Sequence, residues 1–180
     1  MKYIFDLKDI PSDKLAKSGG KASSLSLMMK NLKVNIPGGY VITADGFRDG
    51  KLTDEASEEL NRTIAKLDRL KTYAVRSSAI GEDGANNSFA GQYETLTDVM
   101  VPKIRDAVKQ VAASAKSDRV EEYKNRNDIS GEGIGIVIQE FVKPDYAGVI
   151  FTSDIITGKD DKIVGNYVHG EGEKLVSGMP

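Results

Sequence analysis

The 180-residue chain has the composition of a folded globular protein. Hydrophobic residues make up 39% of it and charged residues 29%, with a formal net charge of -2. This composition excludes a disordered chain, and the small net charge provides no overall field that would recruit nucleic acid. The length fits one ordinary domain, or two small lobes, with a buried core.

Cysteine usage and hydrophobic runs limit the cellular setting. The sequence has no cysteine, which excludes disulfides and thiolate metal sites and agrees with a cytoplasmic location. No apolar stretch approaches about 18 residues, and no signal-peptide pattern opens the chain. We therefore expect a cytoplasmic protein with no membrane and no nucleic acid among its partners.

The pattern of apolar residues predicts a chain of mixed α and β elements. Strands are expected at residues 3–5, 40–43, 73–75, 134–138 and 147–152, the last two as an antiparallel pair. Helices are expected at residues 21–32, 54–70 and 101–126. Thr43 or Asp45 is placed to cap a brief helical turn after the second strand. The order of these elements indicates an α+β fold, or an α/β fold with mixed order, and we expect α+β.

Two glycines precede Lys21 at the expected start of the first helix. The free amides at such a helix end, together with the lysine ammonium, suit an anion. The spacing differs from the P-loop pattern, in which serine or threonine follows the lysine directly. Taken alone, this segment is explained equally well by a helix start with a solvated lysine.

The segment 74–95 concentrates one arginine, several hydroxyls and flexible glycines. The apolar run 73–75 predicts the end of a strand, so that Arg76 emerges there with its guanidinium free for phosphate oxygens. Turn-forming residues fill 81–88, and Gly91 allows backbone amides to approach a ligand closely. The alternative is an exposed polar hairpin with a surface arginine.

The β-branched run 134–138 is followed by Gln139 and Glu140. A buried strand that emerges at this polar pair could present main-chain groups to a flat heterocycle, with Phe141 or Val142 adding apolar surface. A core strand with a polar end is the more common structure behind such a run.

Seven segments together carry a resemblance to a known family: Gly19–Ala22, Ile36–Thr43, Ala74–Ala79, Ser88–Gln92, Val137–Glu140, Gly148–Thr152 and Gly170–Gly178. In this order they resemble the N-terminal nucleotide-binding domain of the pyruvate phosphate dikinase and phosphoenolpyruvate synthase family, which includes rifampicin phosphotransferase. The resemblance covers nearly all of residues 1–180. It implies an ATP-grasp fold, in which two α+β lobes clamp ATP.

The resemblance implies a role for residues of the first segments at the phosphates. Lys21 and Arg76 would bind the phosphates and stabilise charge on the transferring group. Gly91 and Thr95 would belong to a loop that covers the phosphates. In this family the β-phosphoryl group of ATP passes to a histidine on a separate swivelling domain, leaving AMP and, in a second step, phosphate or pyrophosphate.

The resemblance also implies an adenine pocket lined by Gln139, Glu140 and Val142, in part through main-chain groups. Relatives often carry a tryptophan where this chain has His169, its only histidine. His169 lies within a motif of the nucleotide domain itself. We therefore expect it to have a structural or pocket-wall role, and not to accept the phosphoryl group.

The chain departs from the family pattern at two further places. Relatives carry a longer insertion between the positions of Thr43 and Tyr73. They also continue past Pro180 into a segment whose acidic and glutamine side chains hold Mg²⁺ against the triphosphate. We therefore expect the metal ligands outside this chain, with weak nucleotide binding at best and no turnover by the chain alone.

Three interpretations of the whole chain stay open at this point. It is part of an ATP-dependent phosphotransferase, either as a fragment or as one half of a split enzyme. Alternatively, it is a nucleotide-sensing module that binds ATP or AMP without transfer, or an interaction domain that keeps the fold. Titration with ATP and Mg²⁺ separates the interaction domain from the two nucleotide-binding interpretations.

Overall fold

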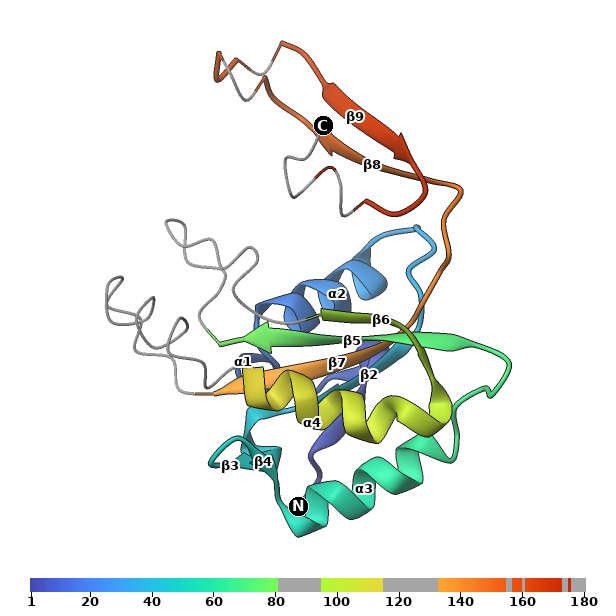
Figure 1. Cartoon of the computed structure of the whole chain (residues 1–180). Coiled ribbons are helices and arrows are strands. Elements are labelled where there is room, and N and C mark those ends of the chain that lie inside the picture. The colour runs from blue at the N-terminus through green and yellow to red at the C-terminus, as the bar shows by residue number, and fades with distance from the viewer. Residues whose placement is uncertain (81–94, 115–132, 155–156, 160, 173–174, 176–180) are drawn as a thin grey trace. The chain divides into compact units, whose positions relative to one another are not determined.

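A computed structural model describes residues 1–80, 95–114, 133–154, 157–159, 161–172 and 175 (Figure 1). The chain divides into two units, Met1–Phe141 and Val142–Pro180. Each unit is described by itself below. In the described part of the chain, no helix has the length and apolar character needed to cross a membrane.

The first unit is built on a five-stranded sheet in which every neighbouring pair is antiparallel. Across the sheet its strands are β1 (Ile4–Asp6), β2 (Gly39–Ile42), β7 (Ile134–Glu140), β5 (Thr72–Ala79) and β6 (Thr95–Met100). The longer helices are α1 (Ser12–Ser18), α2 (Gly20–Asn31), α3 (Asp54–Ile64) and α4 (Ile104–Ser114). The predicted mixture of helices and strands is thus confirmed.

Short elements complete this unit. Three 3₁₀ turns are η1 (Leu7–Asp9), η2 (Ala44–Gly46) and η3 (Val101–Lys103). A two-stranded ribbon is formed by β3 (Phe47–Arg48) and β4 (Lys51–Leu52). η2 begins directly after Thr43, as expected, but the Thr43 hydroxyl does not cap the turn: it donates to the Asp45 carboxylate, and the carbonyl of Tyr3 lies within hydrogen-bond distance of the same oxygen.

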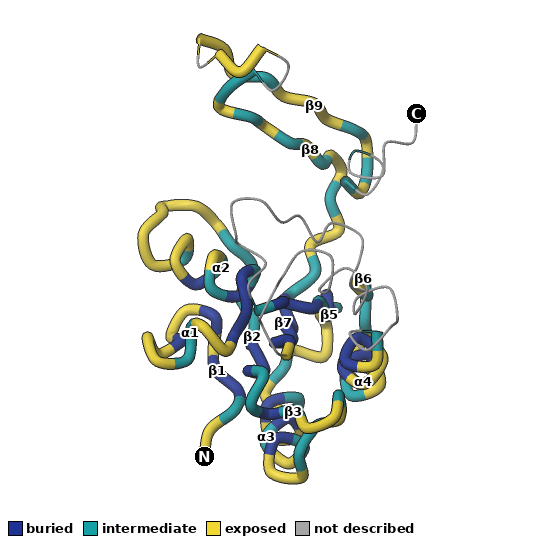
Figure 2. The backbone as a smooth tube through the Cα atoms, turned by 90° about the vertical axis from the view of Figure 1, so that its left-hand side faces the viewer, coloured by how far each residue is buried: buried dark blue, intermediate teal, exposed yellow. Residues whose placement is uncertain are grey.

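Helices cover both faces of the sheet, and the buried strands lie between them (Figure 2). Side chains alternate along β7, because successive residues of a strand point to opposite faces. Ile136 and Ile138 pack with Val108 of α4, whereas Val137 packs with Ala22 of α2. The sheet therefore has an α4 face and an α2 face, each with its own apolar cluster.

Helix boundaries agree with the sequence patterns at α2 and differ at α3. α3 ends at Ile64 instead of residue 70, because Leu70 is 96% exposed and does not continue the buried stripe. The chain turns after the helix, where the Asp68 amide donates to the Tyr73 hydroxyl at 3.1 Å. The third expected helix is present as η3 and α4, and its expected part beyond Ser114 lies outside the described residues.

The prediction that a strand ends at residue 75 is wrong. β5 continues through Arg76 to Ala79 and pairs with β7 along its whole length. Ser77 and Ser78 are both buried in it. Two serines do not end this strand, because the sheet provides ladder partners and the Ser78 hydroxyl has a hydrogen-bond partner in α2. Arg76 therefore lies within the sheet and not at a strand end.

The second unit contains an antiparallel hairpin of β8 (Tyr146–Phe151) and β9 (Val164–His169). The prediction that residues 134–138 and 147–152 pair with each other is therefore wrong. Both edges of β7 are already occupied by β2 and β5, so β7 has no edge left for a hairpin partner.

Candidate functional site

The α2 face of the sheet brings together several of the residues expected at the phosphates. Arg76 lies directly opposite Val137 of β7 and directly opposite Thr95 of β6. Residues directly opposite each other in an antiparallel sheet share a face. Val137 packs against Ala22 of α2, so Arg76 and Thr95 belong to the α2 face. This part of the expected constellation is formed by strand register alone.

Arg76 is half-buried within β5. No hydrogen bond or ion pair joins its guanidinium to any of the described residues. A buried or half-buried arginine is normally paired with a carboxylate or other acceptor, because its planar donor fork is costly to leave without one. Its setting therefore suits an anion that comes from outside the described residues, and a phosphate matches the fork in geometry and charge.

The first turn of α2 is held on this same face. The main-chain amide of Ala22 donates to the Ser78 hydroxyl over 3.1 Å. Ser78 follows Arg76 by two residues, so both side chains point to the α2 face. Lys21, the second residue of α2, immediately precedes Ala22 and is half-buried. The structure thus attaches the lysine-bearing helix to the arginine-bearing strand.

Glycine is required where α2 begins. Gly19 has a φ of +79°, and a Cβ atom there would lie 2.0 Å from the carbonyl oxygen of Ser78. Gly135 on β7 has a similar role, since its Cβ would lie 2.4 Å from the carbonyl oxygen of Ser18. The junction between α1 and α2 therefore rests directly on the backbone of β5 and β7, without side chains between them.

Gln139 lies on the α2 face of β7, directly opposite Ala74, and is almost fully buried. Its side-chain amide donates to the carbonyl of Pro37 over 2.9 Å. This bond holds the segment that leads into β2. Among the expected adenine residues, Gln139 therefore has at least one structural partner within the protein.

Glu140 ends β7 and is tied to the neighbouring strand. Both of its carboxylate oxygens accept hydrogen bonds from the Lys71 ammonium at 2.9 Å, and this bonding raises the pKa of Lys71. The Glu140 amide donates to the Gly38 carbonyl, and the next amide, that of Phe141, donates to Thr72. These two main-chain donors are therefore already engaged.

The other expected site residues lie elsewhere. Gly91 lies outside the described residues. Val142 is the first residue of the second unit and is 60% exposed. His169 packs edge-to-face on Tyr146 within the β8–β9 hairpin, with ring centroids 5.2 Å apart. The structural or pocket-wall role expected for His169 stays a prediction.

The described residues do not form a metal centre of their own. Among them, no three histidine, cysteine, aspartate or glutamate side chains gather in a group that could hold a metal ion. A site with three or more such protein ligands is therefore absent from the described residues, and no chemical step is assigned to a metal within them.

Two relationships at this site were not anticipated from the sequence: the Ser78–Ala22 bond and the Lys71–Glu140 ion pair. The sequence could have indicated the Ser78–Ala22 bond. If the strand is continued beyond residue 75, the period of two along a strand places Ser78 on the same face as Arg76. No sequence pattern indicates the Lys71–Glu140 ion pair, since Lys71 and Glu140 are neighbours only through the register of β5 and β7.

An antiparallel sheet that carries a half-buried arginine without a partner among the described residues, together with a glycine-led helix start, has the features of an anion-binding domain. Residues 47–180 match the model of a known family, the pyruvate phosphate dikinase AMP/ATP-binding domain. The chain therefore belongs to this family. Its sequence similarity to phosphotransferases also extends over most of residues 1–46, which lie before the part matched by the family model.

Relatives match nearly the whole chain. A rifampicin phosphotransferase from Streptomyces sviceus is 27% identical over 220 residues, which cover 99% of this chain and 25% of the relative. A phosphoenolpyruvate synthase from Aquifex aeolicus is 32% identical, covering 96% of this chain and 26% of the relative. The uncharacterized phosphotransferase YvkC from Bacillus subtilis is 35% identical over 80% of this chain.

This chain is much shorter than the relatives that it matches. The chain spans about a quarter of the length of the first two relatives. The match to the first relative runs over 220 residues, more than the 180 of this chain, so that relative has additional residues within the matched stretch. This agrees with the expected longer insertion in relatives, without locating it.

Proposed function

We propose that residues 1–180 form the N-terminal part of the ATP-binding domain of a phosphotransferase of the phosphoenolpyruvate synthase and pyruvate phosphate dikinase type. In this proposal the domain has an ATP-grasp fold and holds ATP. A phosphoryl-accepting histidine domain, in the same or a separate polypeptide, takes up the phosphoryl group. Family membership and the phosphotransferase relatives support this function.

The observation that carries the proposal is the state of Arg76. Its guanidinium is half-buried on the α2 face, opposite Thr95, and has no partner among the described residues. A triphosphate provides oxygens at the right spacing for a two-pronged arginine contact. Lys21 at the start of α2 adds a second positive charge, and the helix end adds partial positive charge.

The proposed transfer has a defined balance of bonds. A ring nitrogen of the accepting histidine forms a bond to the β-phosphorus of ATP. The bond from that phosphorus to the oxygen bridging the α- and β-phosphates breaks, and AMP leaves with this oxygen, so the histidine first carries the β- and γ-phosphates together. In a second step water or phosphate attacks the γ-phosphorus, the bond from this phosphorus to the oxygen bridging the β- and γ-phosphates breaks, and phosphate or pyrophosphate leaves, so that the β-phosphoryl group remains on the histidine. Negative charge grows on the bridging oxygen and spreads over the transferring group, where positioned cations are most effective. Lys21 and Arg76 have this role in the proposal.

The remaining roles follow the resemblance. Gly91 and Thr95 cover the phosphates with an amide and a hydroxyl, and Gln139, Glu140 and Val142 line the adenine. Because the Glu140 and Phe141 amides already donate to the carbonyls of Gly38 and Thr72, the adenine contacts in this proposal use other main-chain groups. Mg²⁺ would accompany ATP and neutralise charge on its phosphates, and its protein ligands are expected outside this chain. A cytoplasmic location stays a prediction of the sequence.

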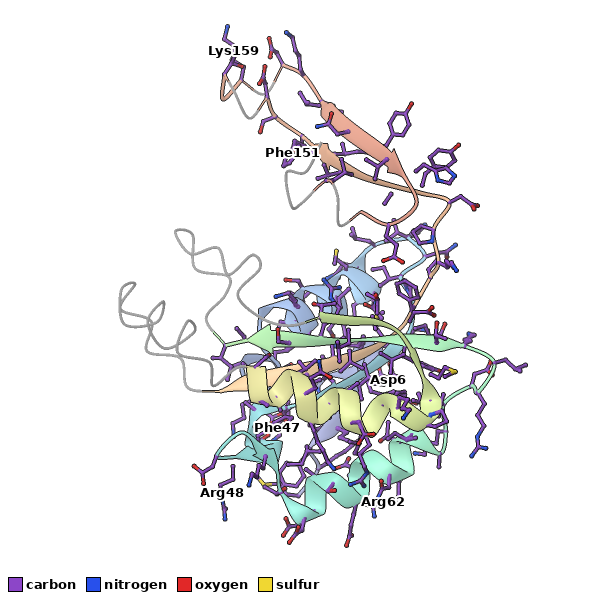
Figure 3. The ribbon with its side chains drawn as sticks, viewed as in Figure 1. Asp6, Phe47, Arg48, Arg62, Phe151 and Lys159 are labelled. Atoms are coloured by element: carbon purple, nitrogen blue, oxygen red, sulfur yellow. The ribbon has the colours of Figure 1, made fainter. Side chains whose placement is uncertain are left out.

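Calorimetric titration with ATP and Mg²⁺ tests the nucleotide site. We expect weak binding by the chain, and we expect Arg76→Ala to lower the affinity about 10- to 100-fold, the usual loss for hydrogen bonds to a charged group. The matched control is Arg48→Ala, which removes the same charge from an exposed position on β3 (Figure 3). No heat up to millimolar ATP from a folded chain, or equal losses in both variants, contradicts the proposed site.

Transfer is tested separately from binding. Adding a candidate partner polypeptide that carries both the expected metal-ligand segment and the histidine domain, with ATP and Mg²⁺, should release AMP, measured by chromatography, and label the histidine when the β-phosphate is radioactive. Binding of ATP without any AMP in the presence of that domain would favour the nucleotide-sensing interpretation instead.

A further inference from the structure

We infer that Ser78 is a positioning residue of the nucleotide site, whose hydroxyl fixes the start of α2, and with it Lys21, against the strand that carries Arg76. This inference rests on the function proposed above. It concerns a side chain that is fully buried and reaches no ligand directly. Ser78 therefore acts through the two cation-bearing segments.

The bond to Ser78 takes the place of a missing helix cap. The first amides of an α-helix have no partner inside the helix, and a side chain of the preceding residue usually accepts from one of them. The residue before α2 is Gly19, which has no side chain and makes no such bond. Ser78, 56 residues away from Ala22 in the sequence, provides the acceptor from β5 over 3.1 Å.

The close approach of the Gly19 backbone to Ser78 fixes the position of the first turn of α2. A Cβ atom on Gly19 would lie 2.0 Å from the Ser78 carbonyl oxygen and 2.6 Å from the Ser78 hydroxyl oxygen. The start of α2 is thus in direct contact with Ser78 on both its main chain and its side chain. A small change at the hydroxyl is therefore transmitted to the first turn of the helix, because no flexible side chain lies between them.

The consequence concerns the spacing of the two positive charges. Arg76 and Ser78 are separated by about 6.6 Å along one face of the strand, from the usual rise per residue. Lys21 is the residue directly before the amide that Ser78 binds. Holding phosphates between two cations requires their separation to be fixed to within about 0.5 Å. The Ser78 hydroxyl is the contact that fixes it.

The chain offers two matched controls. Ser77 is the next residue of the same strand and is also buried, but it points to the α4 face. Ser26 is fully buried in α2, and its hydroxyl has no hydrogen-bond partner among the described residues, so its removal breaks no bond within them. Serine-to-alanine changes at the three positions remove the same atom from three different settings.

The test titrates the 180-residue chain and its Ser78→Ala, Ser77→Ala and Ser26→Ala variants with Mg²⁺-ATP, tripolyphosphate and adenosine. We expect Ser78→Ala to lower the affinity for ATP and tripolyphosphate about tenfold, while adenosine affinity stays within about twofold of the wild type. Both control variants should keep all three affinities within about twofold. A purely structural role would lower the affinity for adenosine as much as that for ATP.

Two outcomes overturn the inference while leaving the proposed function intact: unchanged ATP affinity in Ser78→Ala, or equal losses for ATP and adenosine. Failure of the wild-type chain to bind ATP contradicts the proposed function and this inference with it. Should Ser78→Ala fail to fold, Ser78→Cys takes its place, since a thiol keeps the shape but accepts weakly. The cysteine variant should lose phosphate affinity selectively, and an unchanged ATP affinity overturns the inference.

Discussion

Arg76 of β5 and Thr95 of β6 lie directly opposite each other in the antiparallel ladder of the sheet. The two residues come from either side of segment 81–94 in the sequence, and pairing of the strands places them on one face. This relationship joins a guanidinium and a hydroxyl, the two kinds of donor expected at the phosphates of ATP.

Thr95→Val removes the hydroxyl while keeping a β-branched side chain that suits a strand. If Thr95 donates to a phosphate oxygen, the affinity for ATP should fall roughly 2- to 10-fold, the range for a neutral hydrogen bond. Calorimetry at constant Mg²⁺ measures the change. Thr97→Val, two residues farther along the same strand, is the control, and equal losses in the two variants would contradict the assignment.

Gly19→Ala should be strongly destabilising, because its backbone lies in a region open to glycine and its new methyl group would meet the Ser78 carbonyl. We expect a loss of roughly 2–3 kcal/mol in the free energy of unfolding. Urea denaturation followed by circular dichroism gives the value. Gly38→Ala is the matched control, since nothing lies within 4 Å of its Cβ position, and its effect should stay within about 1 kcal/mol.

Asp45 should contribute to stability at neutral pH and lose this contribution in acid. Burial alone raises its pKa, but hydrogen bonds from Thr43, Lys17 and Lys14 outweigh burial and hold the pKa below the ordinary 3.8. A carboxylate with a lowered pKa stabilises the folded state above its unfolded pKa, and the effect disappears as the pH falls through the folded pKa.

The measurement for Asp45 compares the wild type with Asp45→Asn by urea denaturation at several pH values. The difference in unfolding free energy should be largest near neutral pH and shrink as the pH falls below 3.8. Other carboxylates titrate in both proteins and cancel in the difference. A difference that stays constant across the acid range would show that the ion pairs to Lys14 and Lys17 do not stabilise the fold.

Much of the fold was predictable, because local periodicity is strong in this chain. The start of α2 follows from its flanking glycines, and the buried stripe of α4 follows from the helical spacing of Ile104, Val108 and Val111. Strand pairing was not predictable in the same way. Residues 134–138 and 147–152 are close in sequence and look like a hairpin, yet β7 pairs with β2 and β5, whose partners come from far earlier in the chain.

The candidate site, too, was predictable only where it depends on local sequence patterns. Lys21 and Arg76 are identifiable from the sequence, because glycines before a lysine and a cation within a hydroxyl-rich segment are local patterns. The sequence also predicted the family, since seven short segments in one order resemble its pattern, and the family model that matches residues 47–180 confirms this prediction. A local pattern does not show which side-chain and main-chain groups already have hydrogen-bond partners within the protein.

The tertiary structure decided which of these polar groups already have partners within the protein. It left the Arg76 guanidinium without a partner among the described residues, and it used the Gln139 amide and the Glu140 main-chain donor within the protein. It also joined Lys21 to the strand of Arg76 through Ser78. The physical reason is that hydrogen bonding depends on distances between segments remote in sequence, and only sheet register and helix packing set those distances.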